Sequence, residues 1–202
     1  MAKLRVRHHV NPLSDRSEYS FAGFGNDRPI IVDIGADRGE FVAGLISQLG
    51  DTHNFLVLEI RRPLAVRLEA LFADSTNVAV FAGDAVRNIR ALLEPALMHD
   101  GATIGQIYVN FPDPWFKDRH HKRRVLCQRL IDDVRTWMPP GVMWVYQTDQ
   151  KALFDDTMQL LRNNNVNHIQ MLDSAPYGVS TKWEGAKIAA GDTIYRATFA
   201  LL

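Results

Sequence analysis

The chain contains 202 residues, of which 47% are hydrophobic and 23% charged, and its 23 basic side chains balance its 23 acidic ones. This composition is typical of one folded globular domain and excludes an intrinsically disordered chain. The single cysteine, Cys127, excludes an internal disulfide and favours a reducing compartment, so we expect a cytoplasmic protein. No apolar run approaches the roughly 18 residues of a membrane span, and the basic start lacks the apolar region of a secretory signal.

The first 28 residues are polar, contain glycine and begin with a group of basic side chains. We predict that residues 1–28 form a basic N-terminal arm on or beside the core, and that residues 29–202 form the domain itself. The basic group consists of Lys3, Arg5, Arg7, His8 and His9.

Five short apolar runs, rich in Val, Ile and Phe, follow one another along the chain. Such runs are typical of strands buried on both faces of a parallel sheet. They cover residues 29–34, 55–60, 78–85, 105–113 and 142–149.

Segments with helical spacing of apolar residues lie between these runs, at 39–50, 63–75, 122–138 and 151–164. Strands that alternate with helices predict a doubly wound, mostly parallel α/β sheet. Two late runs predict a closing hairpin around a long connection, which brings the sheet to seven strands. These runs cover residues 168–172 and 194–201.

Each of the five early runs ends in a carboxylic acid. Ligands of open parallel sheets bind outside the carboxyl ends of the strands, so we expect these acids to line one rim. The alternative for any one of them is an ordinary helix N-cap. The five acids are Asp33, Glu59, Asp84, Asp113 and Asp149.

The loop VDIGADRGEF, residues 32–41, follows the first predicted strand and opens a helix. Gly35 permits a tight turn there, and Gly39 permits close helix packing or backbone approach. The spacing lacks the third glycine of a dinucleotide fingerprint, which disfavours a nicotinamide dehydrogenase. It favours a loop that holds a small cationic or zwitterionic group beside Asp33.

Two further acids extend this site. Glu59 ends the next strand, where an acidic residue accepts hydrogen bonds from ribose hydroxyls. Asp84 ends the third strand, where it could accept a hydrogen bond from an adenine amino group. A ligand with adenosine at one end and positive charge at the other fits S-adenosylmethionine.

The stretch NFPDPWFKDRHHKRR, residues 110–124, places a proline-flanked acid before a dense basic run. The run is a candidate contact for RNA phosphates, and its alternative is the solvated first turns of a helix. A positive cluster at a helix N-terminus opposes the macrodipole, which suggests a role outside the helix. His120 and His121 have no further ligands at suitable spacing, so we expect no metal site.

This stretch resembles the signature of the bacterial tRNA (guanine-N7-)-methyltransferase family almost residue for residue. YQTD at 146–149 and STKWEG at 180–185 resemble two later motifs of the family, and RVRHHVNPL at 5–13 resembles its N-terminal arm. The resemblance runs through residues 30–199. It implies a class I (Rossmann-like) methyltransferase fold, S-adenosylmethionine as cofactor, and tRNA methylated at guanine N7, position 46, in the variable loop.

The resemblance also implies roles for individual residues. The cofactor carboxylates fall on Asp33, Glu59, Asp84 and Asp113, beside Gly35 and Gly39 of the loop. The guanosine contacts fall on Lys117, Asp149, Thr181, Lys182, Trp183 and Glu184. The RNA-binding segment falls on Arg119, His120, His121, Lys122, Arg123 and Arg124. The chain departs from the family at Asp37, where the family usually has Gly, and at Asp192, where the family more often has His.

The chemistry itself places few demands on the site, because guanine N7 carries a free lone pair and needs no general base. In-line placement of the two reactants is what such a site must provide. Asp113 is the expected catalytic residue: it would accept from the N1–H and N2–H₂ edge of guanine and ease the positive charge formed on the purine. Its alternative role is that of a turn former.

Trp115 and the segment at 181–184 each have an alternative interpretation as well. Trp115 could stack on a base, although a core aromatic beneath the loop is favoured. The sequence TKWE at 181–184 also predicts a capping box at a helix N-terminus.

Two rival functions stay open from the sequence. One is a class I methyltransferase with another substrate. The other is a tRNA-binding paralogue without catalysis, in which Asp37 spoils the cofactor loop. The sequence leaves the choice between monomer and homodimer open.

Overall fold

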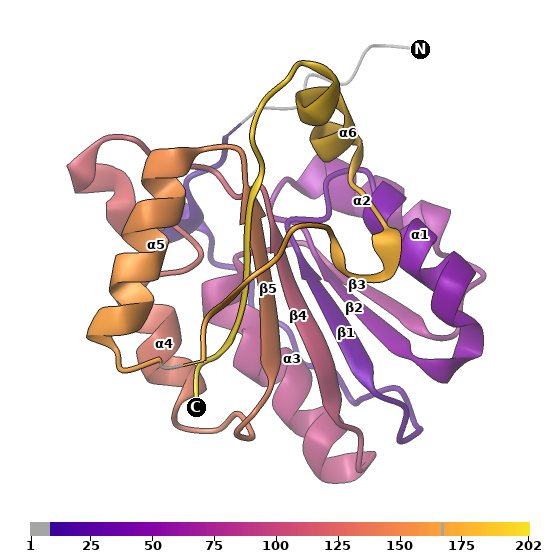
Figure 1. The fold of residues 1–202 in the computed structure, drawn as a ribbon. Helices are drawn as coiled ribbons and strands as arrows, with labels where there is room; N and C mark the ends of the chain where they lie inside the picture. The colour runs from indigo at the N-terminus through magenta and orange to yellow at the C-terminus, as the bar shows by residue number, and fades with distance from the viewer. Residues whose placement is uncertain (1–8, 167) are drawn as a thin grey trace.

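A seven-stranded sheet forms the centre of the computed structural model, which describes residues 9–166 and 168–202. The strand order is β3-β2-β1-β4-β5-β7-β6, with β1 to β5 parallel and β7 antiparallel to both of its neighbours (Figure 1). The predicted doubly wound, mostly parallel sheet is therefore confirmed. The strands are β1 (Ile30–Ile34), β2 (Asn54–Leu58), β3 (Val78–Phe81), β4 (Ile104–Asn110), β5 (Met143–Thr148), β6 (Gln170–Met171) and β7 (Tyr195–Ala200).

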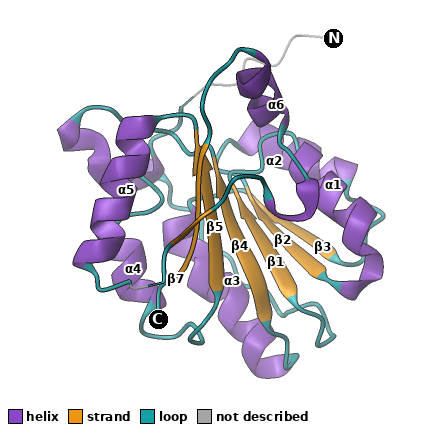
Figure 2. Cartoon of the chain, in the orientation of Figure 1, coloured by secondary structure: helices purple, strands orange, loops and turns teal. Residues whose placement is uncertain are grey.

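Helices cover both faces of this sheet (Figure 2). One apolar core packs α3, α4 and α5 against the sheet, and a second core packs α1 and α2 against the opposite face. None of the helices in the described ranges is long and apolar enough to cross a membrane. The helices are α1 (Glu40–Leu49), α2 (Arg62–Leu71), α3 (Ala85–His99), α4 (Gln128–Val134), α5 (Lys151–Asn163) and α6 (Lys182–Ala189).

The central strands owe their position to continuous apolar sequence. Every residue of β1 and β2 is buried, as expected for strands covered on both faces. Larger aromatic side chains fill the layers above and below: Tyr108 of β4 packs edge-on against Phe41 of α1, and Trp144 of β5 stacks on Phe199 of β7. This packing on both faces holds the sheet in place, and with it the residues at the ends of the strands.

Helix α3 lies in a stretch for which the sequence pattern predicted no helix. It contains Pro95 in its interior, a residue that normally interrupts a helix and so obscures the pattern. Asp84 caps its first turn by accepting a hydrogen bond from the backbone N–H of Val86 at 3.3 Å. The buried face of α3 packs into the larger core, and this tertiary packing offsets the cost of the proline.

The predicted helix over 122–138 is wrong in its first third. Lys122 and Arg123 lie in a 3-10 helix, Asp118–Arg123, and the α-helix starts only at Gln128. Residues 124–127 between them form a series of bends, in which Leu126 is buried in the larger core and Val125 packs against it. The basic run therefore does not face the dipole of an α-helix, and the argument from an opposed macrodipole is also wrong.

The described part of the predicted arm, residues 9–28, packs against the domain, and its middle contacts the edge strand β3. Tyr19 and Phe21 pack edge-on against Phe81. The carboxylate of Asp100 accepts hydrogen bonds from the backbone N–H groups of Phe24 and Gly25, at 2.6 and 3.1 Å. The first four basic residues assigned to the arm, up to His8, and the start of the 5–13 motif lie outside the described residues.

Candidate active site

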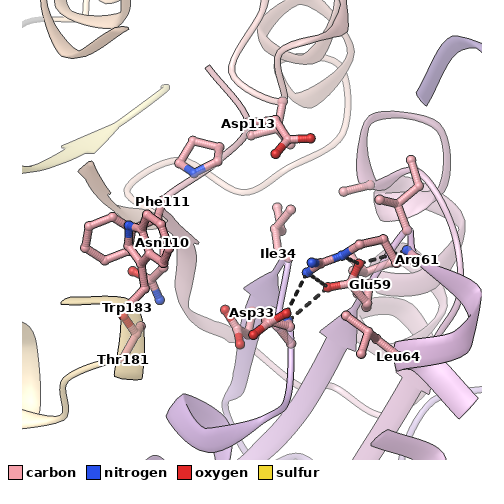
Figure 3. Close-up of a pocket in the computed structure, with 18 of the residues that line it drawn as sticks. Asp33, Ile34, Glu59, Arg61, Leu64, Asn110, Phe111, Asp113, Thr181 and Trp183 are labelled. Carbon is pink, nitrogen blue, oxygen red and sulfur yellow. Dashed lines mark hydrogen bonds and ion pairs between the residues drawn. The ribbon is translucent and has the colours of Figure 1, made fainter. Parts of the chain in front are cut away.

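The five predicted acids meet in one cleft of about 1390 Å³ at the carboxyl ends of the parallel strands. The sheet topology brings them together, because parallel strands all finish at the same edge. Only Glu59 and Asp149 directly follow a strand; Asp33 lies inside β1, and Asp84 and Asp113 lie in the loops beyond β3 and β4. Figure 3 shows the acids of β1 and β2 on one side and the residues after β4 on the other.

Asp33 is a buried carboxylate without a full set of partners. It is 2% exposed, and its Oδ2 atom has no hydrogen-bond partner in the part of the chain that the structure describes. Burial, with a smaller contribution from the charge of Glu59, raises the pKa of Asp33 to about 7. A buried anion in this state is stabilised by a cation, so the site suits the positive end of a ligand.

Glu59 is the most heavily hydrogen-bonded acid of the cleft, and it is 1% exposed. Its Oε1 atom accepts from the backbone N–H and Nε of Arg61, at 2.8 and 2.9 Å. Its Oε2 atom accepts from the backbone N–H of Asp37 and from Nη2 of Arg61, at 2.9 and 2.8 Å. The role of Arg61 was not predicted, although its place two residues after Glu59 was visible in the sequence.

The loop after β1 keeps a tight shape around Asp37. The backbone N–H groups of Gly35 and Ala36 both donate to the carbonyl of Leu58. Asp37 has a φ of 51°, a left-handed conformation that Asp tolerates better than most residues, and its Oδ1 lies 3.0 Å from Nη2 of Arg61. The loop thus forms with Asp in place of the Gly usual in the family.

The two glycines assigned to the cofactor have different surroundings. Gly35 lines the cleft, with a φ of 85° and open space where a Cβ would lie. Gly39 does not line the cleft, and a Cβ there would come within 2.5 Å of Leu68. A left-handed φ of 80° and close packing on α2 together account for glycine at position 39.

Asp84 lines the cleft beside the N-terminal segment. It is largely buried, and this burial, partly offset by the hydrogen bond from Val86, raises the pKa of Asp84. Its backbone N–H donates to Oδ2 of Asp15 at 2.7 Å. Asp15 was not among the predicted site residues, because nothing in the local sequence links it to a position so distant in the chain.

Asp113 lies in a loop of unusual backbone conformation. Phe111 and Trp115, on either side of it, have φ values of 48° and 44°. Such conformations are costly for bulky residues and cluster at functional sites. The side chain of Asp113 is 37% exposed, and its Oδ1 lies 2.7 Å from Nδ1 of His9, the first described residue. The loop thus presents a carboxylate to the cleft opposite Asp33 and Glu59.

Trp115 is not the core aromatic that the sequence favoured. It belongs to neither apolar core and is only half-buried. The guanidinium of Arg123 lies 4.9 Å from its ring centroid, and the rings of His9 and His120 lie 6.1 and 5.9 Å away. The left-handed turn at Trp115 directs the ring toward the basic segment instead of the core.

Just after β5, Asp149 lines the same cleft and makes an ion pair with Lys187 of α6, at 2.9 Å. Burial opposes its ionisation, but hydrogen bonds from Lys187 and Gln150 outweigh burial and lower the pKa of Asp149. This ion pair ties the N-terminal end of α5 to α6, so both helices meet at the substrate side of the cleft.

At the N-terminus of α6, the predicted capping box is confirmed. Thr181 accepts from the backbone N–H of Glu184 at 3.0 Å, and Glu184 accepts from that of Thr181 at 3.3 Å. Glu184 is also buried against Arg196 and Gln147, with an ion pair of 2.6 Å to Arg196. It does not line the cleft, whereas Thr181, Lys182 and Trp183 do.

The basic segment divides into exposed and anchored residues. Lys117, Arg119 and Lys122 are exposed and lie outside the lining of the cleft, as do His120 and His121. Arg123 lines the cleft, while Arg124 donates to the carbonyl of Pro114 and to Asp156. Within the described ranges, no group of three or more His, Cys, Asp or Glu side chains is placed to hold a metal ion.

Solved structures with similar folds identify the fold class of the chain. A precorrin-6y C5,15-methyltransferase from Geobacter metallireducens matches with a TM-score of 0.54 at 13% identity, over 86% of this chain and 80% of that one. Aeropyrum pernix fibrillarin, with natively bound S-adenosyl-L-methionine, matches with a TM-score of 0.52 at 12% identity, over 87% of this chain and 67% of that one. The fold is thus that of class I methyltransferases.

Sequence relatives identify the family. A family model described as putative methyltransferase matches residues 27–197. A tRNA (guanine-N(7)-)-methyltransferase from a Synechocystis species is 31% identical over 97% of both chains. Another from Synechococcus elongatus is 34% identical over 74% of this chain and 72% of its own. The chain therefore belongs to the methyltransferase family of these tRNA (guanine-N(7)-)-methyltransferases.

Proposed function

We propose that the protein transfers the methyl group of S-adenosylmethionine to N7 of guanine in tRNA, in the variable loop. The observation that carries the proposal is the arrangement of the cleft. Buried carboxylates, including the unpartnered Oδ2 of Asp33, lie on one side, and a strained acidic loop with a basic segment behind it lies on the other. The relatives that span almost the whole chain carry the same activity in their names.

The cofactor side fits S-adenosylmethionine, which supplies an electrophilic methyl group on a positively charged sulfur. Asp33 would hold the positive end of this molecule, because Oδ2 of its buried carboxylate has no hydrogen-bond partner within the described ranges. Glu59 would accept from the ribose hydroxyls and Asp84 from the adenine end. Gly35 leaves room for the methionine part to lie against the loop.

On the substrate side, the residues would orient guanine. Asp113 accepts from the Watson–Crick edge of the base, which points N7 toward the methyl group and offsets the positive charge that methylation places on the ring. No residue has to remove a proton, because N7 carries none. In-line placement accounts for most of the rate enhancement.

Around the base, α6 and the basic segment would hold the rest of the RNA. Lys182 and Trp183 reach the cleft from α6, and Asp149 lines it from the loop after β5, whereas the exposed Lys117 lies outside its lining. The segment from Arg119 to Arg123 would neutralise phosphates of the same strand. Glu184 acts as a positioning residue, because its carboxylate anchors α6 to the sheet through Arg196.

The single cysteine and the proposed tRNA substrate support a cytoplasmic location, and we propose a monomer or a homodimer. The decisive experiment incubates unmodified tRNA with the protein and labelled S-adenosylmethionine, followed by reduction and aniline cleavage at N7-methylguanosine. Cleavage at one position of the variable loop is expected. Transfer of label to another position or to another macromolecule would show that the proposed substrate is wrong, while the methyltransferase activity itself would stand.

A non-catalytic tRNA-binding protein is the second candidate, and one observation favours it. All acceptor positions of Glu59 are filled by Arg61 and the backbone of Asp37. Calorimetric titration with S-adenosylhomocysteine separates the two candidates: tRNA binding without any cofactor binding would favour the non-catalytic protein.

A further inference from the structure

Arg61 covers the carboxylate on which the ribose of the cofactor is proposed to lie. Its guanidinium makes a two-pronged contact with Glu59, from Nε to Oε1 at 2.9 Å and from Nη2 to Oε2 at 2.8 Å. Figure 3 shows the side chain extending from the Glu59 side toward the middle of the cavity. Arg61 therefore lies in the path of a ligand that approaches Glu59.

Hydrogen-bond accounting shows that Glu59 has no free acceptor. A carboxylate has about four acceptor positions. Backbone N–H groups of Arg61 and Asp37 fill two of them, and the guanidinium fills the other two. Since Glu59 is 1% exposed, solvent cannot offer an additional approach. Two ribose hydroxyls can bind Glu59 only after the guanidinium leaves.

The side chain of Asp37 offers the guanidinium a second position. Its Oδ1 already lies 3.0 Å from Nη2 of Arg61, and the side chain is 55% exposed, so it can follow a moving partner. The guanidinium stays charged throughout, because burial is outweighed by hydrogen bonding to Glu59 and by the charges of Glu59, Asp37 and Asp113, which raise the pKa of Arg61. A carboxylate at position 37 thus keeps the displaced cation paired.

We propose that Arg61 sets the affinity for the cofactor by competing with its ribose hydroxyls for Glu59, and that Asp37 receives Arg61 when the cofactor binds. The inference rests on the proposed function, since it requires an adenosine ligand on Glu59. It also explains why this chain carries Asp in the loop: the side chain is the acceptor for the displaced guanidinium, and it does not spoil the loop.

The test is calorimetric titration of the full chain with S-adenosylhomocysteine. Removal of a competitor multiplies the apparent dissociation constant by the fraction of protein in which Glu59 was free to bind. With a free fraction of about one tenth, Arg61→Ala should bind about tenfold more tightly than the wild type. The gain should vanish with the 2′,3′-dideoxy analogue of the ligand, which lacks both hydroxyls. Arg62→Ala, an exposed neighbour outside the cleft, is the control for the change of net charge.

Asp37→Gly tests the second half of the proposal and fits the φ of 51° without strain. This variant should bind S-adenosylhomocysteine more weakly than the wild type by about fivefold, since the displaced guanidinium loses its partner. In the Arg61→Ala background the same change should have no effect. Cooperative thermal unfolding of each variant serves as the control: it shows that the variant is folded, so that a changed affinity reflects binding.

The outcomes separate this inference from the proposed function. Equal or weaker binding of S-adenosylhomocysteine by Arg61→Ala, with binding by the wild type intact, would overturn the competition and leave the methyltransferase in place. An equal effect of Asp37→Gly in both backgrounds would overturn the role of Asp37. Absence of binding by the wild type and by Arg61→Ala alike would overturn the proposed cofactor, and with it the inference.

Discussion

The two sides of the cleft are built in different ways. On the cofactor side, Asp33 lies within a buried strand, Glu59 directly after one, and Asp84 at the N-cap of α3. On the substrate side, Asp113 lies in a half-exposed loop with two left-handed residues, and α6 is joined to the sheet by long connections. The sheet itself therefore positions the cofactor, whereas loops and one anchored helix position the RNA.

Charge pairing separates the two sides as well. Glu59 on the cofactor side is paired with Arg61, but Oδ2 of Asp33 has no hydrogen-bond partner among the described residues, so Asp33 is the acid left open to a positive ligand. The acids of the substrate side already have basic partners: Asp113 contacts His9, and Asp149 contacts Lys187. A neutral nucleobase can enter such a surface without the repulsion that free carboxylates would exert on RNA phosphates.

The largest effect is expected where the substrate side depends on a buried anchor. Glu184→Gln leaves the charge of Arg196 buried without its partner, and this should lower the free energy of unfolding by about 3–5 kcal/mol. Urea denaturation measures the change. Glu40→Gln, which removes the exposed partner of Lys182, is the control and should cost less than about 1 kcal/mol. Equal losses in both variants would show that Glu184 is no anchor.

Next in size is the loss expected at the acidic loop. Asp113→Ala should lower kcat of tRNA methylation about 100-fold, because an oriented group that stabilises developing charge is removed. Affinity for tRNA should change little, since phosphate contacts dominate it. Steady-state kinetics and filter binding measure the two quantities. Asp118→Ala, a fully exposed acid of the same segment, is the control, and a fully active Asp113→Ala enzyme would remove the proposed role.

The difference between the two sides also explains how far the sequence could be interpreted. Buried strands carry their pattern in consecutive apolar residues, so the positions of β1 to β5 along the sequence were predictable. The convergence of the five acids was predictable for the same reason. The capping box at Thr181 was predictable because its partners are three residues apart. These features depend on local sequence or on a general rule for parallel sheets.

Features that depend on distant partners were not predictable. The bends at residues 124–127 place Leu126 in the core, and this packing overrides the helical pattern at the start of 122–138. Asp15 contacts Asp84, which lies 69 residues further along the chain, and Trp115 turns outward through a left-handed backbone that no local motif requires. Arg61 was adjacent to a predicted residue, but only side-chain geometry showed that it fills the acceptors of Glu59.

A smaller, graded effect is expected from pH on the cofactor side. Burial raises the pKa of Asp33 to about 7, so the folded protein holds a proton there below this pH that the unfolded chain releases near 3.8. The α-ammonium group, which S-adenosylhomocysteine shares with S-adenosylmethionine, would pair with the ionised form of Asp33. The affinity for S-adenosylhomocysteine should therefore fall about tenfold per pH unit below 7 and level off above it. Calorimetry with S-adenosylhomocysteine measures this dependence. Asp33→Asn should bind weakly at every pH, and a wild-type affinity that is flat from pH ~5.5 to ~7 would contradict the assignment.

The same proton links Asp33 to stability, with the opposite sign from an ordinary carboxylate. Because the folded state binds it more tightly, the contribution of Asp33 to stability is largest below its unfolded pKa and declines as the pH rises toward 7. Urea denaturation of the wild type and of Asp33→Asn should converge at low pH and separate near neutrality, with the Asn variant the more stable.

The smallest effect separates two adjacent arginines of the basic segment. Arg123 lines the cleft over Trp115, so Arg123→Ala should weaken tRNA binding about fivefold and reduce the slope of log affinity against log salt by about one. Arg124 is occupied by Pro114 and Asp156 inside the protein, so Arg124→Ala should leave the slope unchanged and lower stability by about 1 kcal/mol. Filter binding at several salt concentrations distinguishes the two residues. An equal loss of slope in both variants would mean that Arg124 leaves its internal partners to bind RNA. Arg124 would then be an RNA-contacting residue and not one that anchors the segment to the protein.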